Sequence, residues 1–208
     1  MTLQTTDGRL IVVSGKSRSG KTAWVVKHIE IHDRIIAWDI EGQFAMLPGW
    51  KKITTKKELL AAVEKEGSVK IAYVSRGRAE FEFWAGCALF WGTYKGPCAA
   101  IAEELADTTS PGKAPEGWGD LVRKGLKRGI WIYAIAQRWA EADKTAIGNA
   151  SEVIAFQSAT QADIDYLALK TRIPAEQLEK LKPLEFIHYD ADTFACIPGK
   201  LTFPRKKK

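Results

Sequence analysis

The segment Gly15 to Thr22, which reads GKSRSGKT, constrains the fold of this chain more than any other feature of the sequence. It satisfies the pattern G-x-x-x-x-G-K-[ST] and directly follows the apolar run LIVVS at Leu10 to Ser14. Glycines let such a loop curl so that successive backbone N–H groups point at phosphate oxygens, and the helix that follows adds the positive end of its dipole. The segment therefore predicts a phosphate-binding loop (P-loop) between a buried strand and a helix.

The P-loop residue types indicate binding of ATP with Mg²⁺. In this pattern the lysine reaches the β- and γ-phosphates, and the hydroxyl of the last residue ligates the metal ion. We therefore assign these roles to Lys21 and Thr22. The predicted nucleotide-binding residues are Gly15, Lys16, Ser17, Arg18, Ser19, Gly20, Lys21 and Thr22.

Short apolar runs alternate with segments of helical periodicity along the chain, and this alternation predicts an α/β fold with a mainly parallel sheet. Most runs are apolar throughout, as expected for strands buried on both faces. The predicted strands are 10–14, 35–39, 70–75, 98–102, 130–136 and 153–157, and the predicted helices are 21–31, 56–66, 79–94, 117–127 and 163–171. Thr55 and Glu58 form a capping box at the start of the second helix. After Pro174 we expect a short helix and a C-terminal β-hairpin or edge strands.

Composition is that of one globular domain. The chain has 208 residues, 46% of them hydrophobic and 27% charged, which is enough to bury a sizeable core. We assign residues 1–204 to a single ATPase domain and 205–208, RKKK, to a basic disordered tail. No apolar run approaches the roughly 20 residues that span a bilayer, and the start of the chain lacks the layout of a signal peptide. These features predict a soluble cytoplasmic protein.

The cysteines Cys87, Cys98 and Cys196 are scattered without CxxC pairing, which argues against a zinc site and against a disulfide framework. We expect reduced, mostly buried thiols.

Polar residues follow three of the predicted strands, where a P-loop enzyme needs an acid for Mg²⁺ and a base for the attacking water. Glu103 and Glu104 follow CAAIA, so we assign the first to Mg²⁺ through water and the second to orientation of the water; an ordinary solvated strand end is the alternative. Gln137 ends the next strand, where its amide would contact the γ-phosphate or the water. Asp39 ends the second strand and is either a third strand-end acid or a cap.

Together these residues resemble the HerA/FtsK superfamily of DNA-pumping ATPases, and within it the small genome-packaging ATPases of tailless, membrane-containing icosahedral viruses. The resemblance extends from about Leu10 to Asp165. Its parts are GKSRSGKT, the strand-end DIEGQF, the acidic pair in AEE, GLKRGIWIYAIAQR, and VIAFQSATQADIDYL.

The resemblance implies a three-layer RecA/FtsK-like fold and a ring, usually a hexamer, that moves double-stranded DNA through a central pore using ATP and Mg²⁺. It also implies a viral capsid vertex or membrane protein as a further partner, and action in the host cytoplasm or at the packaging vertex. Two departures bear on the site residues. The usual acidic order is Asp then Glu, so the roles of Glu103 and Glu104 are open to exchange. Relatives tend to carry an arginine where this chain has Leu126.

Ring ATPases place an arginine of one subunit against the γ-phosphate bound by the next. Arg123 and Arg128 flank the missing arginine and are the first candidates, and Arg76 and Arg78 are two more. Any one of them is otherwise a surface charge. The net charge of +6 is compatible with sequence-independent binding to DNA phosphates. The expected pore-facing residues are Lys113, Arg123, Lys124, Lys127 and Arg128, with Lys206 to Lys208 as a flexible addition.

Three other functions remain open. The cytoplasmic ATPase of a filamentous-phage assembly protein (Zot-like) shares the fold but normally continues into a transmembrane helix. A small nucleotide or metabolite kinase also has a P-loop in about 200 residues, but needs an arginine-rich lid and an acceptor pocket. A nucleotide-dependent scaffold would bind without hydrolysis if Glu104 were misplaced.

Overall fold

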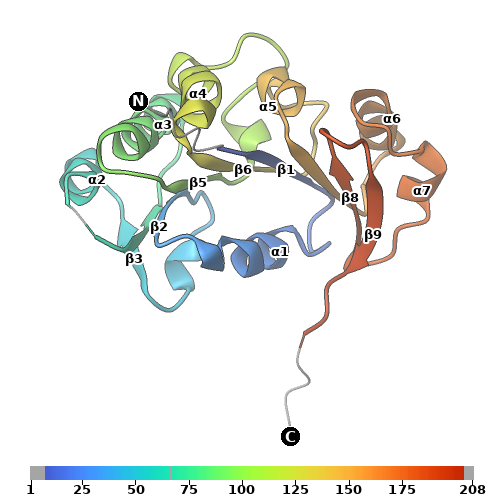
Figure 1. The fold of residues 1–208 in the computed structure, drawn as a ribbon, viewed down its shortest axis with the longest axis horizontal. Helices are drawn as coiled ribbons and strands as arrows, with labels where there is room; N and C mark the ends of the chain where they lie inside the picture. Colours follow the sequence, from blue (N-terminus) through green and yellow to red (C-terminus); the bar gives the residue numbers. More distant parts are fainter. Residues whose placement is uncertain (1–7, 66, 204–208) are drawn as a thin grey trace, which may run out of the picture.

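A nine-stranded sheet organises the chain, whose computed structural model describes residues 8–65 and 67–203 (Figure 1). The strand order is β3-β4-β2-β5-β6-β1-β7-β8-β9. The seven strands from β3 to β7 in this order pair in parallel, whereas β8 and β9 add antiparallel to one edge. The strands are β1 (Leu10–Ser14), β2 (Arg34–Trp38), β3 (Trp50–Ile53), β4 (Val69–Tyr73), β5 (Ala99–Ala102), β6 (Trp131–Ala136), β7 (Glu152–Phe156), β8 (Glu185–Asp190) and β9 (Cys196–Lys200). The predicted α/β fold with a C-terminal hairpin is confirmed.

Helices cover both faces of the sheet (Figure 1). Helix α1 lies on one face, and the other helices lie on the opposite face or beside the hairpin. The helices are α1 (Lys21–His28), α2 (Lys56–Val63), α3 (Arg78–Tyr94), α4 (Glu116–Asp120), α5 (Lys144–Gly148), α6 (Gln161–Lys170) and α7 (Ala175–Glu179). The capping box at the start of α2 is present: the Thr55 hydroxyl accepts from the backbone N–H of Glu58, whose carboxylate accepts from the N–H of Thr55.

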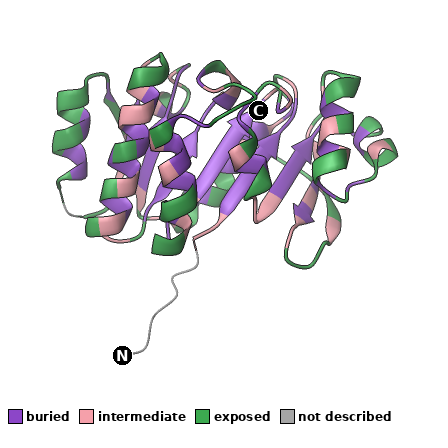
Figure 2. Cartoon of the chain, turned by 90° about the horizontal axis from the view of Figure 1, so that it is seen from above, coloured by how far each residue is buried: buried purple, intermediate pink, exposed green. Residues whose placement is uncertain are grey.

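The sheet separates two hydrophobic cores, which explains why its central strands are apolar throughout (Figure 2). The core on the α1 face includes Ile11, Val13 and Trp24. The larger core on the other face holds the aromatic cluster of Trp38, Phe81, Trp84 and Trp118, all of them fully buried. Burial of an aromatic side chain of this kind contributes a few kcal/mol to the hydrophobic stabilisation, about 3 for the largest.

The structure differs from the predicted elements at three points. Strand β3, with the sequence WKKI, was not predicted because Lys51 and Lys52 point to solvent at the sheet edge, where charge prevents pairing with another chain. Helix α5 was too short to produce a periodic signal. The helix predicted at 117–127 is a composite, because α4 continues into a π-helical turn at Leu121–Gly125 and a 3₁₀ turn at Leu126–Arg128.

The three cysteines are free thiols, with Cys87 and Cys98 buried and Cys196 partly exposed. In the described part of the chain, no helix combines the length and the apolar character needed to cross a membrane. The predicted basic tail at 205–208 lies outside the described residues.

Candidate active site

Sheet order brings the polar strand ends together at one edge. Parallel strands end at the same edge of a sheet, and β6, β5 and β2 follow β1 in succession on one side. The P-loop after β1, the acids after β5, Gln137 after β6 and Asp39 after β2 therefore share this edge. Strand β6 pairs directly with β1, with Ala136 opposite Ser14, so Gln137 follows β6 beside the start of the P-loop.

Backbone conformation of the P-loop requires its two glycines. Gly15 has φ +148 and Gly20 has φ +116, both disfavoured for residues with a Cβ. A Cβ at Gly15 would lie 2.6 Å from Cβ of Phe156 and 2.7 Å from Oγ of Ser19. Arg18 also adopts a left-handed conformation, with φ 61. The loop thus curls tightly, as an anion-binding nest requires.

Lys21 lies inside this curl. Its ammonium group is buried and donates hydrogen bonds to the carbonyls of Gly15 (2.7 Å) and Lys16 (3.1 Å). An ammonium has three donors, so one remains for a phosphate oxygen. Burial lowers the pKa of Lys21 below its usual value, and the carboxylates of Glu104 and Glu103 oppose this effect. The Lys21 ammonium thus lies at the base of the loop with one N–H available for a phosphate.

Glu103 and Asp39 form a buried acidic pair. Burial first, and the neighbouring Asp39 carboxylate second, raise the pKa of Glu103 to about 8. Oε2 of Glu103 and Oδ1 of Asp39 are buried and accept no hydrogen bond from a described residue. Asp39 uses its other oxygen to accept from the N–H of Ala45 at 2.8 Å.

This donor set fits Mg²⁺, which prefers oxygen ligands and keeps several waters. Glu103 is close enough to Lys21 to influence its pKa, Asp39 is next to Glu103, and Thr22 lines the cavity beside Lys21. Within the described ranges no cluster of three or more His, Cys, Asp or Glu side chains forms a protein-only metal site. A magnesium ion here would therefore depend on the phosphates of a nucleotide for part of its coordination.

Glu104 has a strained backbone conformation, and its side chain accepts a hydrogen bond. It has φ 45 and ψ 58, a left-handed conformation that costs a residue with a side chain about 1–3 kcal/mol and is common at functional sites. Its Oε1 accepts a hydrogen bond of 2.9 Å from Nε2 of Gln137. Glu104, predicted to orient the water, and Gln137, predicted to contact the γ-phosphate or the water, are thus in direct contact.

A cavity of about 420 Å³ runs along the P-loop. Lys21, Thr22, Glu104 and Gln137 line it, together with four residues that the sequence analysis did not assign to the site: Ala23, Gln43, Leu184 and Phe203. Gln43 belongs to the DIEGQF segment, which could have identified it. Leu184 and Phe203 flank the C-terminal hairpin, and no local pattern connects them with the P-loop.

The four candidate arginines lie outside this cavity. Arg76 is paired with Glu41 (3.4 Å) and Arg78 with Glu82 (3.2 Å). Arg123 is paired with Asp120 (3.4 Å), and Arg128 donates to the Thr93 hydroxyl (3.0 Å). The segment with Arg123 and Arg128 leads into the start of β6, at the sheet edge opposite the P-loop.

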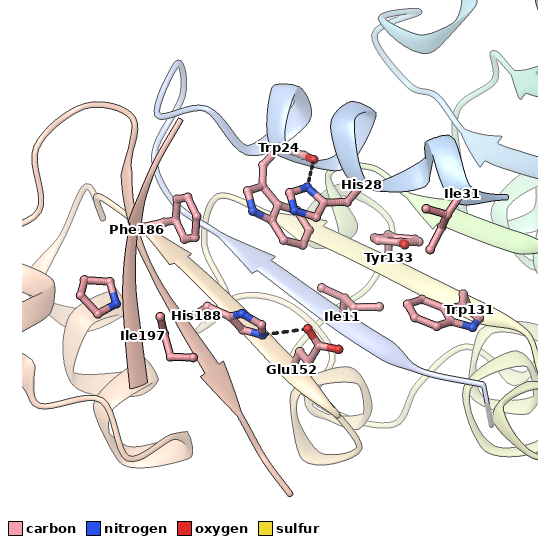
Figure 3. Close-up of a pocket in the computed structure, with 12 residues that line it drawn as sticks. Ile11, Trp24, His28, Ile31, Trp131, Tyr133, Glu152, Phe186, His188 and Ile197 are labelled. Atoms are coloured by element: carbon pink, nitrogen blue, oxygen red, sulfur yellow. Dashed lines mark hydrogen bonds and ion pairs between the residues drawn. The ribbon is translucent and has the colours of Figure 1, made fainter. Parts of the chain in front are cut away.

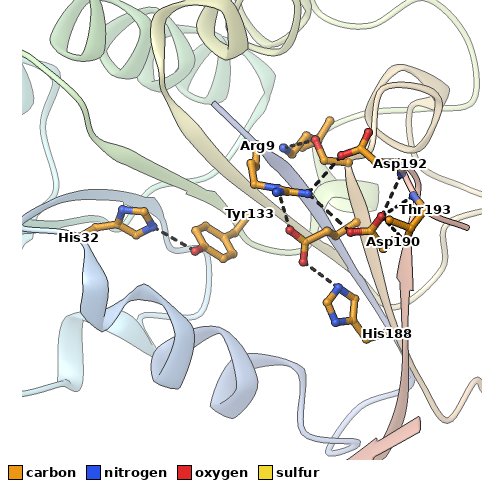
Figure 4. Close-up of polar contacts among 10 residues, drawn as sticks. Arg9, His32, Tyr133, His188, Asp190, Asp192 and Thr193 are labelled. Carbon is orange, nitrogen blue, oxygen red and sulfur yellow. Dashed lines mark hydrogen bonds and ion pairs between the residues drawn. The ribbon is translucent and has the colours of Figure 1, made fainter. Parts of the chain in front are cut away.

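A second pocket, of about 340 Å³, lies under the far end of α1 (Figure 3). Its wall includes Trp24 and His28, whose rings stack with centroids 3.7 Å apart, and Tyr133. Figure 4 shows the polar network beside it, in which the Glu152 carboxylate lies 2.9 Å from Nε of Arg9 and 2.8 Å from Nε2 of His188. This pocket shares no lining residue with the P-loop cavity.

One curated protein resembles the chain over most of its length. It is protein P9 of Pseudoalteromonas phage PM2, which is 30% identical over 187 residues that cover 86% of this chain and 83% of P9. No protein-family model matches the chain.

Solved structures match the fold at lower identity. The genome-packaging NTPase B204 of Sulfolobus turreted icosahedral virus 2, in complex with AMPPCP, has a TM-score of 0.78 at 15% identity, covering 95% of this chain and 100% of B204. The plasmid coupling protein TrwB, in complex with ADP and Mg²⁺, has a TM-score of 0.65 at 9% identity, covering 98% of this chain and 88% of TrwB. These matches confirm the predicted P-loop NTPase architecture.

Proposed function

The chain belongs to the same family as protein P9 of phage PM2, and from that premise, together with its fold, we propose that it is an ATP-driven motor that translocates double-stranded DNA. Its resemblance to small viral packaging ATPases of the HerA/FtsK superfamily rests on the P9 match and on the shared fold of B204 and TrwB. The proposed task is to package a viral genome into a preformed capsid. The proposed place of action is the host cytoplasm or the packaging vertex.

The observation that carries the ATPase assignment is the contact between Glu104 and Gln137 in the cavity that contains Lys21 and Thr22. A phosphate-binding site alone is compatible with binding without turnover. An acid held by an amide beside the same cavity adds a group that accepts a proton from water. This arrangement favours hydrolysis over a scaffold role.

The residues divide the work as follows. The backbone N–H groups of the P-loop and the remaining ammonium N–H of Lys21 bind the phosphates and balance their negative charge. Thr22, Glu103 and Asp39 would hold Mg²⁺, which when bound neutralises charge on the β- and γ-phosphate oxygens. Gln137 orients the Glu104 carboxylate, and Glu104 orients the attacking water and accepts its proton.

DNA binding is supported by charge and exposure. Arg123, Lys124, Lys127 and Arg128 are all exposed on the turn before β6, and Lys113 is exposed on the preceding loop. Lys113 and Arg123 line one cavity of about 610 Å³ together with Arg78, and the acidic Glu82, Glu116 and Asp120 line it too, so the support for DNA binding comes from the exposed basic side chains and not from this cavity. Contacts of this kind bind phosphates without reading sequence, as a DNA pump needs. We propose a ring, most simply a hexamer, in which one of the candidate arginines acts on the nucleotide of the next subunit.

The test is ATP hydrolysis by the full chain with and without long double-stranded DNA, with the solution mass measured in a nonhydrolysable ATP analogue. Stimulation by DNA and a ring-sized mass are expected. Lys21→Ala should abolish nucleotide binding or turnover, whereas Glu104→Gln should bind ATP and not hydrolyse it. Wild-type turnover by Glu104→Gln would remove this residue as the base. A monomer that ignores DNA and phosphorylates a small acceptor would instead identify a kinase.

The DNA surface has its own test. A variant with the four basic residues of 123–128 changed to Gln should bind duplex DNA more weakly and with a shallower dependence on salt. The log–log slope should fall by up to about 0.9 for each DNA phosphate that the variant no longer neutralises. A control variant removes the same charge elsewhere by changing four exposed lysines to Gln: Lys51, Lys52, Lys57 and Lys65. Equal binding by the two variants would contradict a specific role for 123–128.

A further inference from the structure

We propose that Phe203, together with Leu184, forms the nucleobase-binding wall of the ATP site. This inference rests on the proposed function, because it concerns the part of the same cavity that the phosphate and water-orienting groups do not occupy. Both residues flank the C-terminal hairpin of β8 and β9, and both line the cavity of about 420 Å³ that contains Lys21 and Thr22.

Strand order places the hairpin on the correct side of the P-loop. Glu104 and Gln137 follow β5 and β6, which lie on one side of β1, whereas β7, β8 and β9 lie on the other. The P-loop therefore lies between the water-orienting pair and the hairpin. A nucleotide with its γ-phosphate toward Glu104 extends its base in the opposite direction, toward the hairpin.

The hairpin is attached directly to the P-loop. The backbone N–H of Leu184 donates to the carbonyl of Ser19 at 3.2 Å, and the N–H of Leu201 donates to the carbonyl of Leu184 at 2.9 Å. A Cβ at Gly20 would lie 2.9 Å from Cδ1 of Leu201 and 3.3 Å from Cδ2 of Leu184. Gly20 thus allows these leucines to approach the start of α1, and Phe203 follows two residues after Leu201.

Two features of the wall indicate a ligand surface. Leu184 has φ 68, a left-handed conformation that is strained for a leucine and that the contact with Ser19 maintains. Phe203 is 57% exposed, and its ring stacks on no aromatic side chain in the described part of the chain. An aromatic face that is free beside a phosphate site suits a planar base, because every base presents a π-face for stacking.

The experiment compares the affinity of the full chain for ATP and for inorganic tripolyphosphate, which carries the phosphates without a base, by isothermal titration calorimetry. Loss of base stacking by alanine substitution corresponds to a weakening of about 5- to 150-fold. Since Phe203 is half exposed, we expect Phe203→Ala to weaken ATP binding by about 5- to 10-fold and to leave tripolyphosphate binding unchanged. Phe203→Tyr should restore ATP binding because it retains the ring.

Phe194→Ala is the matched control. Phe194 belongs to the turn of the same hairpin, is 48% exposed, and packs its ring under the Arg172 guanidinium instead of beside the P-loop. Its substitution should change neither affinity. The inference is overturned if Phe203→Ala binds ATP as the wild type does, or if it loses affinity equally for ATP and tripolyphosphate. Failure of the wild-type chain to bind either compound would instead overturn the proposed ATPase function, and the base wall with it.

Discussion

The left-handed backbone conformation of Glu104 should affect the free energy of unfolding, independently of any catalytic role. We compare Glu104→Ala with Glu104→Gly, because both remove the carboxylate and its hydrogen bond to Gln137. The two variants differ only in the presence of a Cβ at a residue with φ 45. In an ordinary helix or strand the alanine variant is more stable than the glycine variant. A more stable glycine variant at position 104 would therefore show that the backbone there is strained for a residue with a Cβ.

The expected difference follows from two opposing terms. A left-handed conformation costs a residue with a Cβ about 1–2 kcal/mol. Glycine loses more chain entropy on folding than alanine, which costs about 0.5–1 kcal/mol. The free energy of unfolding of Glu104→Gly should therefore exceed that of Glu104→Ala by about 0.8 kcal/mol, within limits of about 0 and 1.5 kcal/mol. For a chain of 208 residues this corresponds to a Tm difference of about 1–4 °C.

Urea denaturation of both variants, followed by circular dichroism, measures this difference, and ATP hydrolysis should be lost in both. The control pair is Leu60→Ala and Leu60→Gly at an exposed position in the middle of α2, where the glycine variant should be the less stable by about 1 kcal/mol. If glycine were also the less stable variant at 104, the strain attributed to the left-handed conformation of Glu104 would be refuted.

Three further predictions concern packing, pH and the water-orienting pair. Trp84→Ala should lower the free energy of unfolding by about 3–5 kcal/mol, because Trp84 is fully buried; a loss below about 1 kcal/mol in urea denaturation would contradict its place in the core. The pKa of Glu152 lies below its usual value, mainly because of the hydrogen bond with His188, so its contribution to stability is present above pH 4.5 and is lost as the pH falls through the lowered pKa. Glu152→Gln should therefore weaken the fall in the free energy of unfolding at acid pH. An unchanged fall would contradict the contact between Glu152 and His188. Gln137→Ala should reduce kcat by about 10- to 100-fold with ATP affinity unchanged, because the amide contacts Glu104 and not the P-loop. Steady-state kinetics and ATP-binding measurements test this, and a raised KM with an unchanged kcat would contradict it.

The arrangement at the sheet edge was predictable from sequence because it depends on strand ends. LIVVS before GKSRSGKT identifies β1, and the apolar runs before Glu103 and Gln137 identify β5 and β6. In a parallel sheet these ends lie at the same edge, so the sequence indicated that Glu104 and Gln137 share one edge, whereas their hydrogen bond depends on the pairing of β5 with β6. The catalytic roles of these residues, and the role of any arginine in a neighbouring subunit, stay predictions.

The hairpin side of the site was not predictable for a physical reason. Leu184 and Phe203 reach the P-loop through tertiary contacts, including the hydrogen bond between Leu184 and Ser19, and such contacts leave no periodic signal in the sequence. Glu104 illustrates a second limit. Its position in the chain indicated an acid after a strand, but its left-handed backbone is imposed by the surrounding structure, since glutamate has no preference for that conformation.

The central position of β1 has a consequence for how the chain folds. Leu10 pairs with Ile132 on one side and Ile11 with Glu152 on the other, so neither partner strand is near β1 in sequence. Contacts between such distant residues close large loops, which slows folding. During synthesis the apolar β1 strand emerges before β6 and β7 and is exposed to aggregation until they pair with it. The P-loop thus completes its structure late, and a chain truncated before β7 should leave it without a stable support.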